Sequence, residues 1–177
     1  IDDSKAKLLV TASCGFEPGR TVEYKPLVDQ AINLAKHKID KMILFQRSGH
    51  EVKLNAPMEV SWDEAISSAS DADCVEMNSN ELAYILYTSG TTGTPKGIVR
   101  DIGGHIVALK WTMKNIYNVD ADDIWWSASD IGWIVGHSYI VYAPLFKGCT
   151  TILFEGKPVG TPDAGTFWKI ISDYKVK

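Results

Sequence analysis

The sequence has no excess of positive charge. It carries 18 Lys and Arg residues against 22 Asp and Glu residues, so the formal net charge of the 177-residue chain is −4. Proteins that bind nucleic acid or anionic membranes concentrate basic residues on one surface, and the sequence shows no such cluster. The charge pattern therefore predicts no nucleic-acid partner. A ligand that contains phosphate would need positive groups gathered locally.

Cysteine and long apolar runs are also scarce. The three cysteines, Cys14, Cys74 and Cys149, are odd in number and lack metal-ligand spacing, which favours packed thiols in a reducing compartment. The longest uncharged stretch, residues 131–146, is shorter than the ~20 residues that a membrane-spanning helix needs. It also contains glycine and proline. The sequence therefore predicts no membrane span.

What the sequence does have is an alternation of short apolar runs with helical periods. Strands are predicted at residues 8–12, 42–45, 82–87, 98–100, 123–127 and 150–154. Helices are predicted at residues 26–38, 62–70, 103–117, 132–146 and 161–174. Strand alternating with helix indicates an α/β fold with a largely parallel sheet. A polar connection is expected at 71–81, so we expect two parts, residues 1–80 and 81–177.

The most informative segment is residues 87–97, which read Y-T-S-G-T-T-G-T-P-K-G. Glycine lets main-chain N–H groups approach a phosphate closely, the Thr and Ser hydroxyls add donors, and Lys96 adds a positive charge. The spacing is not that of a Walker A loop, because Lys96 follows Pro95 and precedes Gly97. The alternative is a solvated turn between two strands. The composition favours a phosphate-binding loop of another kind.

This loop resembles the signature of the acyl-adenylate-forming (AMP-binding) enzymes. A second stretch, residues 129–145, reads S-D-I-G-W-I-V-G-H-S-Y-I-V-Y-A-P-L and is similar to the second signature of short-chain acyl-CoA synthetases. The segment V-R-D-I-G-G at 99–104 is closest in wording to the propionyl-CoA synthetase branch. The resemblance implies part of the large N-terminal domain of such an enzyme, in which a layered sheet has helices on both faces.

The resemblance implies an acid–thiol ligase that uses ATP, CoA and a short carboxylate, with Mg²⁺ bound by residues outside this chain and no metal ligands within it. Lys96 and Thr88 would be catalytic. The residues implied to hold ATP phosphates are Thr88, Ser89, Gly90, Thr91, Thr92, Gly93, Thr94 and Lys96. The other readings are an acetyl-CoA or medium-chain acyl-CoA synthetase and a non-catalytic nucleotide-binding domain.

The second signature implies an acyl pocket at Trp133, Ile134 and Val135, with Val135 also near the CoA thiol arm. Acetyl-specific relatives tend to have Thr at the position of Val135, and the valine methyl makes the wall more apolar. On periodicity alone, these three residues could equally pack in a core. His137 is expected to be a satisfied polar group within an apolar helix, and Asp130 a helix N-cap.

The resemblance implies a CoA-nucleotide loop at Glu17, Pro18, Gly19 and Arg20. Arg20 can pair with a phosphate, whereas Glu17 replaces an arginine of the family. The alternative is an ordinary Gly-Pro turn. Three aspartates, at 120, 122 and 123, indicate either a metal site or, more simply, a solvated loop.

The sequence also resembles an internal segment of a longer chain, and the parts expected elsewhere are an adenine-binding region, a hinge and a small C-terminal domain with a catalytic lysine. We therefore expect the isolated chain to be inactive and to act only with the rest of the parent chain. The propionate-type wording favours the mitochondrial matrix, with a bacterial cytoplasm as the alternative.

Overall fold

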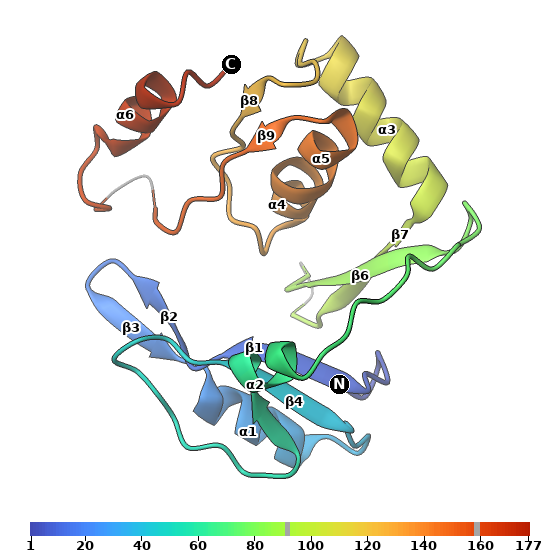
Figure 1. Ribbon diagram of the computed structural model, residues 1–177, viewed down its shortest axis with the longest axis vertical. Helices are drawn as coiled ribbons and strands as arrows, with labels where there is room; N and C mark the ends of the chain where they lie inside the picture. Colours follow the sequence, from blue (N-terminus) through green and yellow to red (C-terminus); the bar gives the residue numbers. More distant parts are fainter. Residues whose placement is uncertain (91–92, 158–159) are drawn as a thin grey trace. The chain divides into compact units, whose positions relative to one another are not determined.

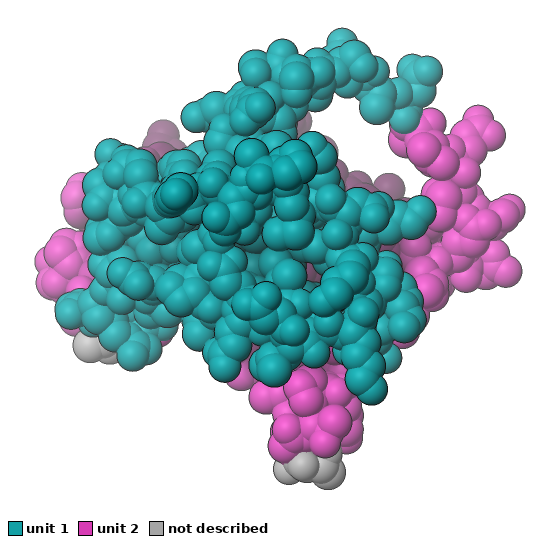
Figure 2. All heavy atoms as spheres, turned by 90° about the horizontal axis from the view of Figure 1, so that it is seen from below, with its two compact units in different colours: residues 1–73 teal, residues 74–177 magenta. Residues whose placement is uncertain are grey.

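The computed structural model describes residues 1–90, 93–157 and 160–177. These residues form two compact units, 1–73 and 74–177, which are coloured separately in Figure 2. Both units combine strands with helices (Figure 1), which confirms the predicted α/β class. The boundary between the units falls inside the polar connection expected at 71–81. The assignment of 1–80 and 81–177 as two parts of one enzyme domain stays a prediction.

The first unit is built on a three-stranded parallel sheet. Its order is β1 (Leu8–Ala12), β4 (Lys41–Phe45) and β5 (Glu59–Ser61). The first two strands were predicted. The third was not, because three residues with one apolar side chain give no period for a pattern to reveal.

Helices cover both faces of this sheet. Met42 and Leu44 of β4 are fully buried and pack with Val28 and Ile32 of α1 (Lys25–Leu34). Successive strand residues point to opposite faces. The neighbouring Phe45 therefore lies on the other face, where its ring contacts Trp62 of α2 at a centroid distance of 6.4 Å.

Both helices end earlier than predicted. Helix α1 stops at Leu34 instead of residue 38, and α2 (Trp62–Ser67) stops three residues short of 70. The predicted start of α2 is confirmed, since the Glu64 N–H donates to the Ser61 hydroxyl at 3.1 Å. Residues 68–70 after α2 are exposed, so no packing extends the last turn of that helix.

A buried ion pair ties α1 to β5. Lys25 Nζ lies 3.1 Å from Glu59 Oε1 and 2.5 Å from Asp29 Oδ1, and the Glu59 side chain is only 1% exposed. Burial by itself lowers the pKa of Lys25, but the hydrogen bonds from Asp29 and Glu59 outweigh it and raise that pKa. The second oxygen of Glu59 accepts the Asn55 N–H at 2.8 Å. The charge of Glu59 is therefore matched by donors on several sides.

The second unit begins with an antiparallel hairpin, β6 (Leu82–Thr88) and β7 (Lys96–Asp101). The sequence pattern predicted a largely parallel sheet, which is wrong for this pair, because a connection of a few residues can join only antiparallel neighbours. β7 also begins at Lys96 and not at residue 98. The hairpin therefore extends to the edge of the predicted phosphate loop.

Strand β7 leads directly into α3 (Ile102–Asn115), as Figure 1 shows. The Asp101 side chain caps α3, since the Gly104 N–H donates to Asp101 Oδ2 at 2.7 Å. Leu109 and Met113 of α3 are buried in the core of this unit, together with Val119, Ala143 and Cys149.

The apolar stretch predicted as one helix at 132–146 is divided into three parts. These are α4 (Ile134–Gly136), the π-helical segment η1 (His137–Tyr142) and α5 (Ala143–Lys147). Gly148 ends α5 with φ of +82°, as its position after the apolar run predicted. A π-helical segment widens the turn and shifts side chains around the axis, and it occurs often at functional sites.

The remaining elements are short. β8 (Ile124–Trp125) and β9 (Thr150–Thr151) pair in parallel over two residues each, where five-residue strands were predicted. α6 (Thr166–Asp173) begins four residues after Pro162, near which the start of this helix was predicted. Among the residues that the structure describes, no helix is long and apolar enough to cross a membrane.

Candidate functional site

The predicted phosphate loop closes the β6–β7 hairpin. Thr88 and Lys96 are direct cross-strand partners where the loop leaves and re-enters the hairpin. Cβ atoms of such partners lie ~4.5–5.5 Å apart, so the two side chains leave the backbone as neighbours at the base of the loop. Ser89, Gly90, Gly93 and Thr94 lie between them. Thr91 and Thr92, which belong to the same prediction, lie outside the described residues.

Two glycines fix the backbone of this loop. Gly90 has φ of +62° and Gly93 has φ of +78°, which is the left-handed region that L side chains avoid. A Cβ on Gly90 would stand 2.6 Å from the carbonyl oxygen of Thr94, whereas a Cβ on Gly93 would meet no described atom within 4 Å. The loop therefore needs glycine at 90 for both conformation and space, and at 93 for conformation alone.

The charge at the loop is available to a ligand. Lys96 is exposed, and within the described residues its ammonium makes no ion pair. Thr88 is half-buried, while Ser89, Gly93 and Thr94 are exposed. Main-chain N–H groups of left-handed turns, hydroxyls and one ammonium make a donor-rich concavity that suits an anion such as a polyphosphate.

Of the three predicted acyl-pocket residues, two line a cavity and the third does not. Ile134 and Val135 open α4 and line a cavity of about 430 Å³ between that helix, β7 and α3. Trp133 is the N-cap of α4, is 65% exposed and does not line this cavity. Val135 is 50% exposed and Ile134 is half-buried.

Residues beside the second signature act structurally. As expected, His137 is a satisfied polar group, because its Nδ1 donates to the carbonyl of Ile131. The prediction that Asp130 caps the helix is wrong. Its carboxylate accepts the Gly132 N–H at 2.7 Å and so stabilises the preceding turn, while the N-cap position belongs to Trp133.

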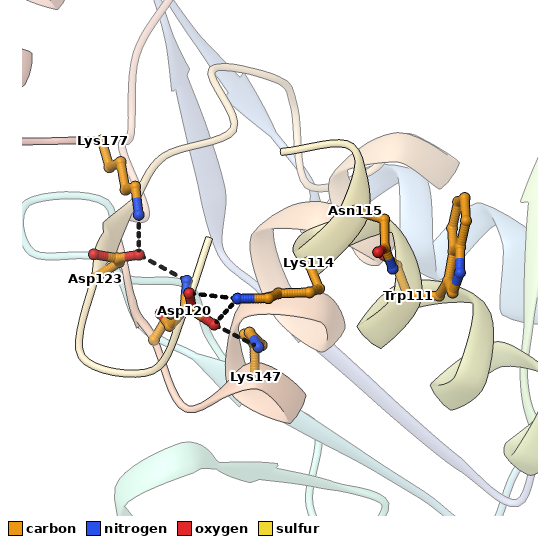
Figure 3. Close-up of polar contacts among 8 residues, drawn as sticks. Trp111, Lys114, Asn115, Asp120, Asp123, Lys147 and Lys177 are labelled. Carbon is orange, nitrogen blue, oxygen red and sulfur yellow. Dashed lines mark hydrogen bonds and ion pairs between the residues drawn. The ribbon is translucent and has the colours of Figure 1, made fainter. Parts of the chain in front are cut away.

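Two of the three aspartates, Asp120 and Asp123, are held by lysines (Figure 3). Asp120 accepts hydrogen bonds from Lys114 at 2.8 Å and pairs with Lys147 at 3.1 Å, and Asp123 pairs with Lys177 at 2.8 Å. Lys114 and Lys147 lower the pKa of Asp120 to about 2. In the part of the chain that the structure describes, no group of three or more His, Cys, Asp or Glu residues could hold a metal.

The predicted CoA-side residues form a hairpin in the first unit. β2 (Cys14–Glu17) pairs with β3 (Arg20–Glu23), and Gly19 at the turn has φ of +76°. Arg20 donates to Glu17 Oε2 through Nε at 2.9 Å and through Nη2 at 2.7 Å. Glu17 thus holds Arg20 across a tight hairpin turn. Both the CoA-nucleotide loop and the ordinary Gly-Pro turn stay open as interpretations of this segment.

A polar cluster beside the Ile134–Val135 cavity was not predicted from the sequence. Tyr84 and Tyr142 stack with centroids 5.1 Å apart, and the Tyr84 hydroxyl lies 3.2 Å from His105 Nε2. Burial and the nearby Arg100 charge lower the pKa of His105. Arg100 Nε is buried and finds no hydrogen-bond partner among the described residues. A pattern of one strand or helix cannot show this cluster, because its members come from four elements, β6, β7, α3 and η1.

The chain resembles known proteins over nearly its whole length. The family model described as "AMP-binding enzyme" matches residues 1–177. The chain is 51% identical to acyl-CoA synthetase short-chain family member 3, mitochondrial, of Bos taurus, over 99% of this chain and 26% of the relative. It is 42% identical to propionate–CoA ligase of Escherichia coli, over 99% of this chain and 28% of that protein. The chain thus spans about a quarter of the length of these relatives.

A solved structure supports the fold. Acetoacetyl-CoA synthetase from Streptomyces lividans superposes with a TM-score of 0.81 over 99% of this chain and 26% of that one, at 21% identity. At this identity the match concerns the fold, and it confirms the expectation of an acyl-CoA synthetase type of α/β architecture.

Proposed function

Because the chain belongs to the AMP-binding enzyme family, we propose that the polypeptide carrying it is a short-chain acid–thiol ligase that acts on propionate. A propionate oxygen attacks the α-phosphorus of ATP, and pyrophosphate leaves with the bonding electron pair. The CoA sulfur then attacks the carbonyl carbon of propionyl-AMP, and AMP leaves. The observation that carries the proposal is the glycine loop with Thr88 and Lys96 paired at its base.

The loop would hold the leaving phosphates. The substrate carboxylate is already ionised at neutral pH, so the chemistry needs positioning and charge stabilisation more than a base. Lys96 places one positive charge at the loop, and the hydroxyls of Thr88, Ser89 and Thr94 can donate to phosphate oxygens. Gly90 and Gly93 have positive φ, a conformation typical of turns whose backbone N–H groups bind anions. We assign the catalytic roles to Lys96 and Thr88 on this basis.

Mg²⁺ would supply charge neutralisation on the phosphates. The loop offers hydroxyl and N–H groups without a carboxylate, which fits phosphate and does not by itself fit a magnesium ligand set. We therefore assign the carboxylate ligands of Mg²⁺ to parts of the polypeptide outside this chain.

Ile134 and Val135 would form one wall of the acyl site, with Trp133 at its rim. An apolar wall favours propionate over acetate only modestly, since one methylene is worth ~1–3 kcal/mol in a pocket. The relative from Escherichia coli is described as a propionate–CoA ligase, and the structural match as an acetoacetyl-CoA synthetase. Acetate and acetoacetate are accordingly the competing substrates.

The β2–β3 turn would contact the CoA nucleotide through Pro18, Gly19 and Arg20. Arg20 must share its guanidinium between Glu17 and a CoA phosphate, so we propose weaker contact than two arginines would give. For the compartment we propose the mitochondrial matrix, in line with the mitochondrial relatives, with the bacterial cytoplasm as the alternative.

Acid-dependent ATP–pyrophosphate exchange tests the proposal. We expect the full-length polypeptide to show the highest kcat/KM with propionate among acetate, propionate, butanoate and 3-oxobutanoate. Lys96→Ala should lower the exchange at least ~100-fold, because it removes a charge that acts on the leaving phosphates. Lys110→Ala, at an exposed position of α3, is the matched control and should leave exchange unchanged. No exchange with any of the four acids contradicts the ligase assignment.

A further inference from the structure

The cavity of the second unit is larger than propionate requires. Its volume is about 430 Å³, within the ~300–1,000 Å³ range of sites that hold drug-sized ligands. Propionate has only five non-hydrogen atoms. One wall is apolar and consists of Ala108 and Leu109 of α3 with Ile134 and Val135 of α4. A longer, partly apolar chain fits this space better than a three-carbon acid alone.

The other end of the cavity is charged, and Arg100 and Asp101 both line it. Among the residues that the structure describes, the Nε of Arg100 is buried without a hydrogen-bond partner. The adjacent carboxylate of Asp101 is engaged by the Gly104 N–H, and no ion pair of Arg100 occurs among the described residues. A guanidinium has five donors and no acceptor. Leaving one of these donors buried and unpaired is costly. Because Arg100 lines the cavity, the other N–H groups of its guanidinium can donate to an entering oxygen.

Two neutral polar groups border the same end. His105 is buried, its Nε2 faces the Tyr84 hydroxyl, and its depressed pKa keeps the ring uncharged near neutral pH. Ser138 is also buried, and within the described residues its hydroxyl makes no hydrogen bond. The cavity therefore has an apolar wall and a polar end that holds the Arg100 guanidinium beside the Asp101 carboxylate.

The position of Arg100 on β7 determines how far from the phosphate loop a ligand group that meets Arg100 lies. Arg100 follows Lys96 by four residues, so their Cα atoms lie about 13 Å apart at the ~3.3 Å rise of a strand. The polyphosphate occupies the Lys96 end in the proposed function. A ligand group that meets Arg100 must therefore sit several atoms away from the reacting carboxyl.

We infer that this cavity binds a carbonyl or hydroxyl oxygen located several atoms along a substrate chain, with Arg100 as its principal donor. The inference rests on the proposed ligase function and deepens it. Two sources supply this chemistry: an acid longer than propionate that carries a second oxygen, and the amide carbonyls of the pantetheine arm of CoA. Both combine an apolar chain with an acceptor oxygen, and both reach the site beside Val135.

The test uses the full-length polypeptide with Arg100→Met, Arg100→Lys and the exposed control Lys110→Met. Pyrophosphate exchange, which needs no CoA, is measured with pentanoate and 4-oxopentanoate, which differ by one carbonyl. Thioester formation with propionate gives the KM for CoA. A hydrogen bond to a charged group corresponds to about a 10- to 100-fold effect.

If the acid supplies the oxygen, Arg100→Met lowers the 4-oxopentanoate to pentanoate ratio of kcat/KM by about 10- to 100-fold, and Arg100→Lys lowers it less. If pantetheine supplies it, exchange is unchanged and the KM for CoA rises by a similar factor. Values within twofold of Lys110→Met in both assays overturn the inference. If the unmodified polypeptide shows no ATP–pyrophosphate exchange with propionate, this result contradicts the proposed function and not the inference. In that case, 4-oxopentanoate and CoA are titrated calorimetrically into the unmodified polypeptide and into the Arg100→Met variant. If both proteins bind both compounds equally well, the inference about the cavity is overturned.

Discussion

Gly90 and Gly93 offer a matched pair for testing how the loop geometry supports catalysis. Both have positive φ, at +62° and +78°, so alanine at either position must adopt the left-handed conformation. This costs ~1–2 kcal/mol, which reduces the population of the native loop by about 5- to 30-fold. We expect Gly93→Ala to reduce kcat/KM for ATP in the exchange assay by this factor, because nothing described lies within 4 Å of the added methyl group.

Gly90→Ala should be more damaging. Its methyl group would stand 2.6 Å from the Thr94 carbonyl oxygen, which is backbone and cannot rotate away. Overpacking of this kind costs a further ~1–3 kcal/mol. The sum of ~2–5 kcal/mol corresponds to a loss of roughly 30- to 5,000-fold in kcat/KM for ATP.

Gly49→Ala is the control for backbone strain elsewhere. Gly49 has φ of +77° and an open Cβ position, and it belongs to the other unit. This variant should lose some stability in urea without a change in the KM for ATP. Equal losses for Gly90→Ala and Gly93→Ala would refute the steric argument. An effect of Gly49→Ala on ATP as large as that of Gly93→Ala would refute the assignment of the loop.

Two further predictions concern stability. Lys25→Met should lower the free energy of unfolding by ~3–5 kcal/mol in urea denaturation, because it leaves the buried Glu59 carboxylate without its counter-charge, and a loss below ~1 kcal/mol would argue against that pair. The pKa of Asp120 is lowered to about 2 from 3.8, so its contribution to stability is present above pH 3.8 and is lost as the pH falls towards 2. Asp120→Asn should therefore flatten the acid dependence of unfolding between these pH values, as followed by circular dichroism, and an unchanged slope would contradict the Lys114 and Lys147 contacts.

The sequence predicted those features that are local. The loop at 87–97 was recognised from its glycines and hydroxyls, and the cap at Ser61 from four consecutive residues. The end of α5 at Gly148 needed only the position of one glycine after an apolar run. In each case the determining interaction lies within a few residues, so a linear pattern contains it.

The features that the sequence did not predict depend on packing or on short strands. The β2–β3 hairpin has four residues on each side, and the segment 14–17 lacks an alternation that would identify a strand. The apolar stretch at 132–146 has the composition of one helix, and nothing in its periodicity reveals the π-helical segment η1. Local propensity is a weak determinant where a segment must fit between α3 and β9, and tertiary packing then decides its form.

The candidate site shows the same division along β7. Its first residue, Lys96, was predicted from the loop motif, whereas Arg100 gains its significance only from the cavity that α3 and α4 build around it. The strand is continuous between these two residues, and a strand in a paired hairpin is nearly inextensible. The Cα atoms of Lys96 and Arg100 are therefore held about 13 Å apart. Because one strand carries both Lys96 and Arg100, we expect the backbone to set the substrate length that the site accepts. Substitutions on the apolar wall can adjust preference by a methylene, but they cannot move Arg100 relative to the loop.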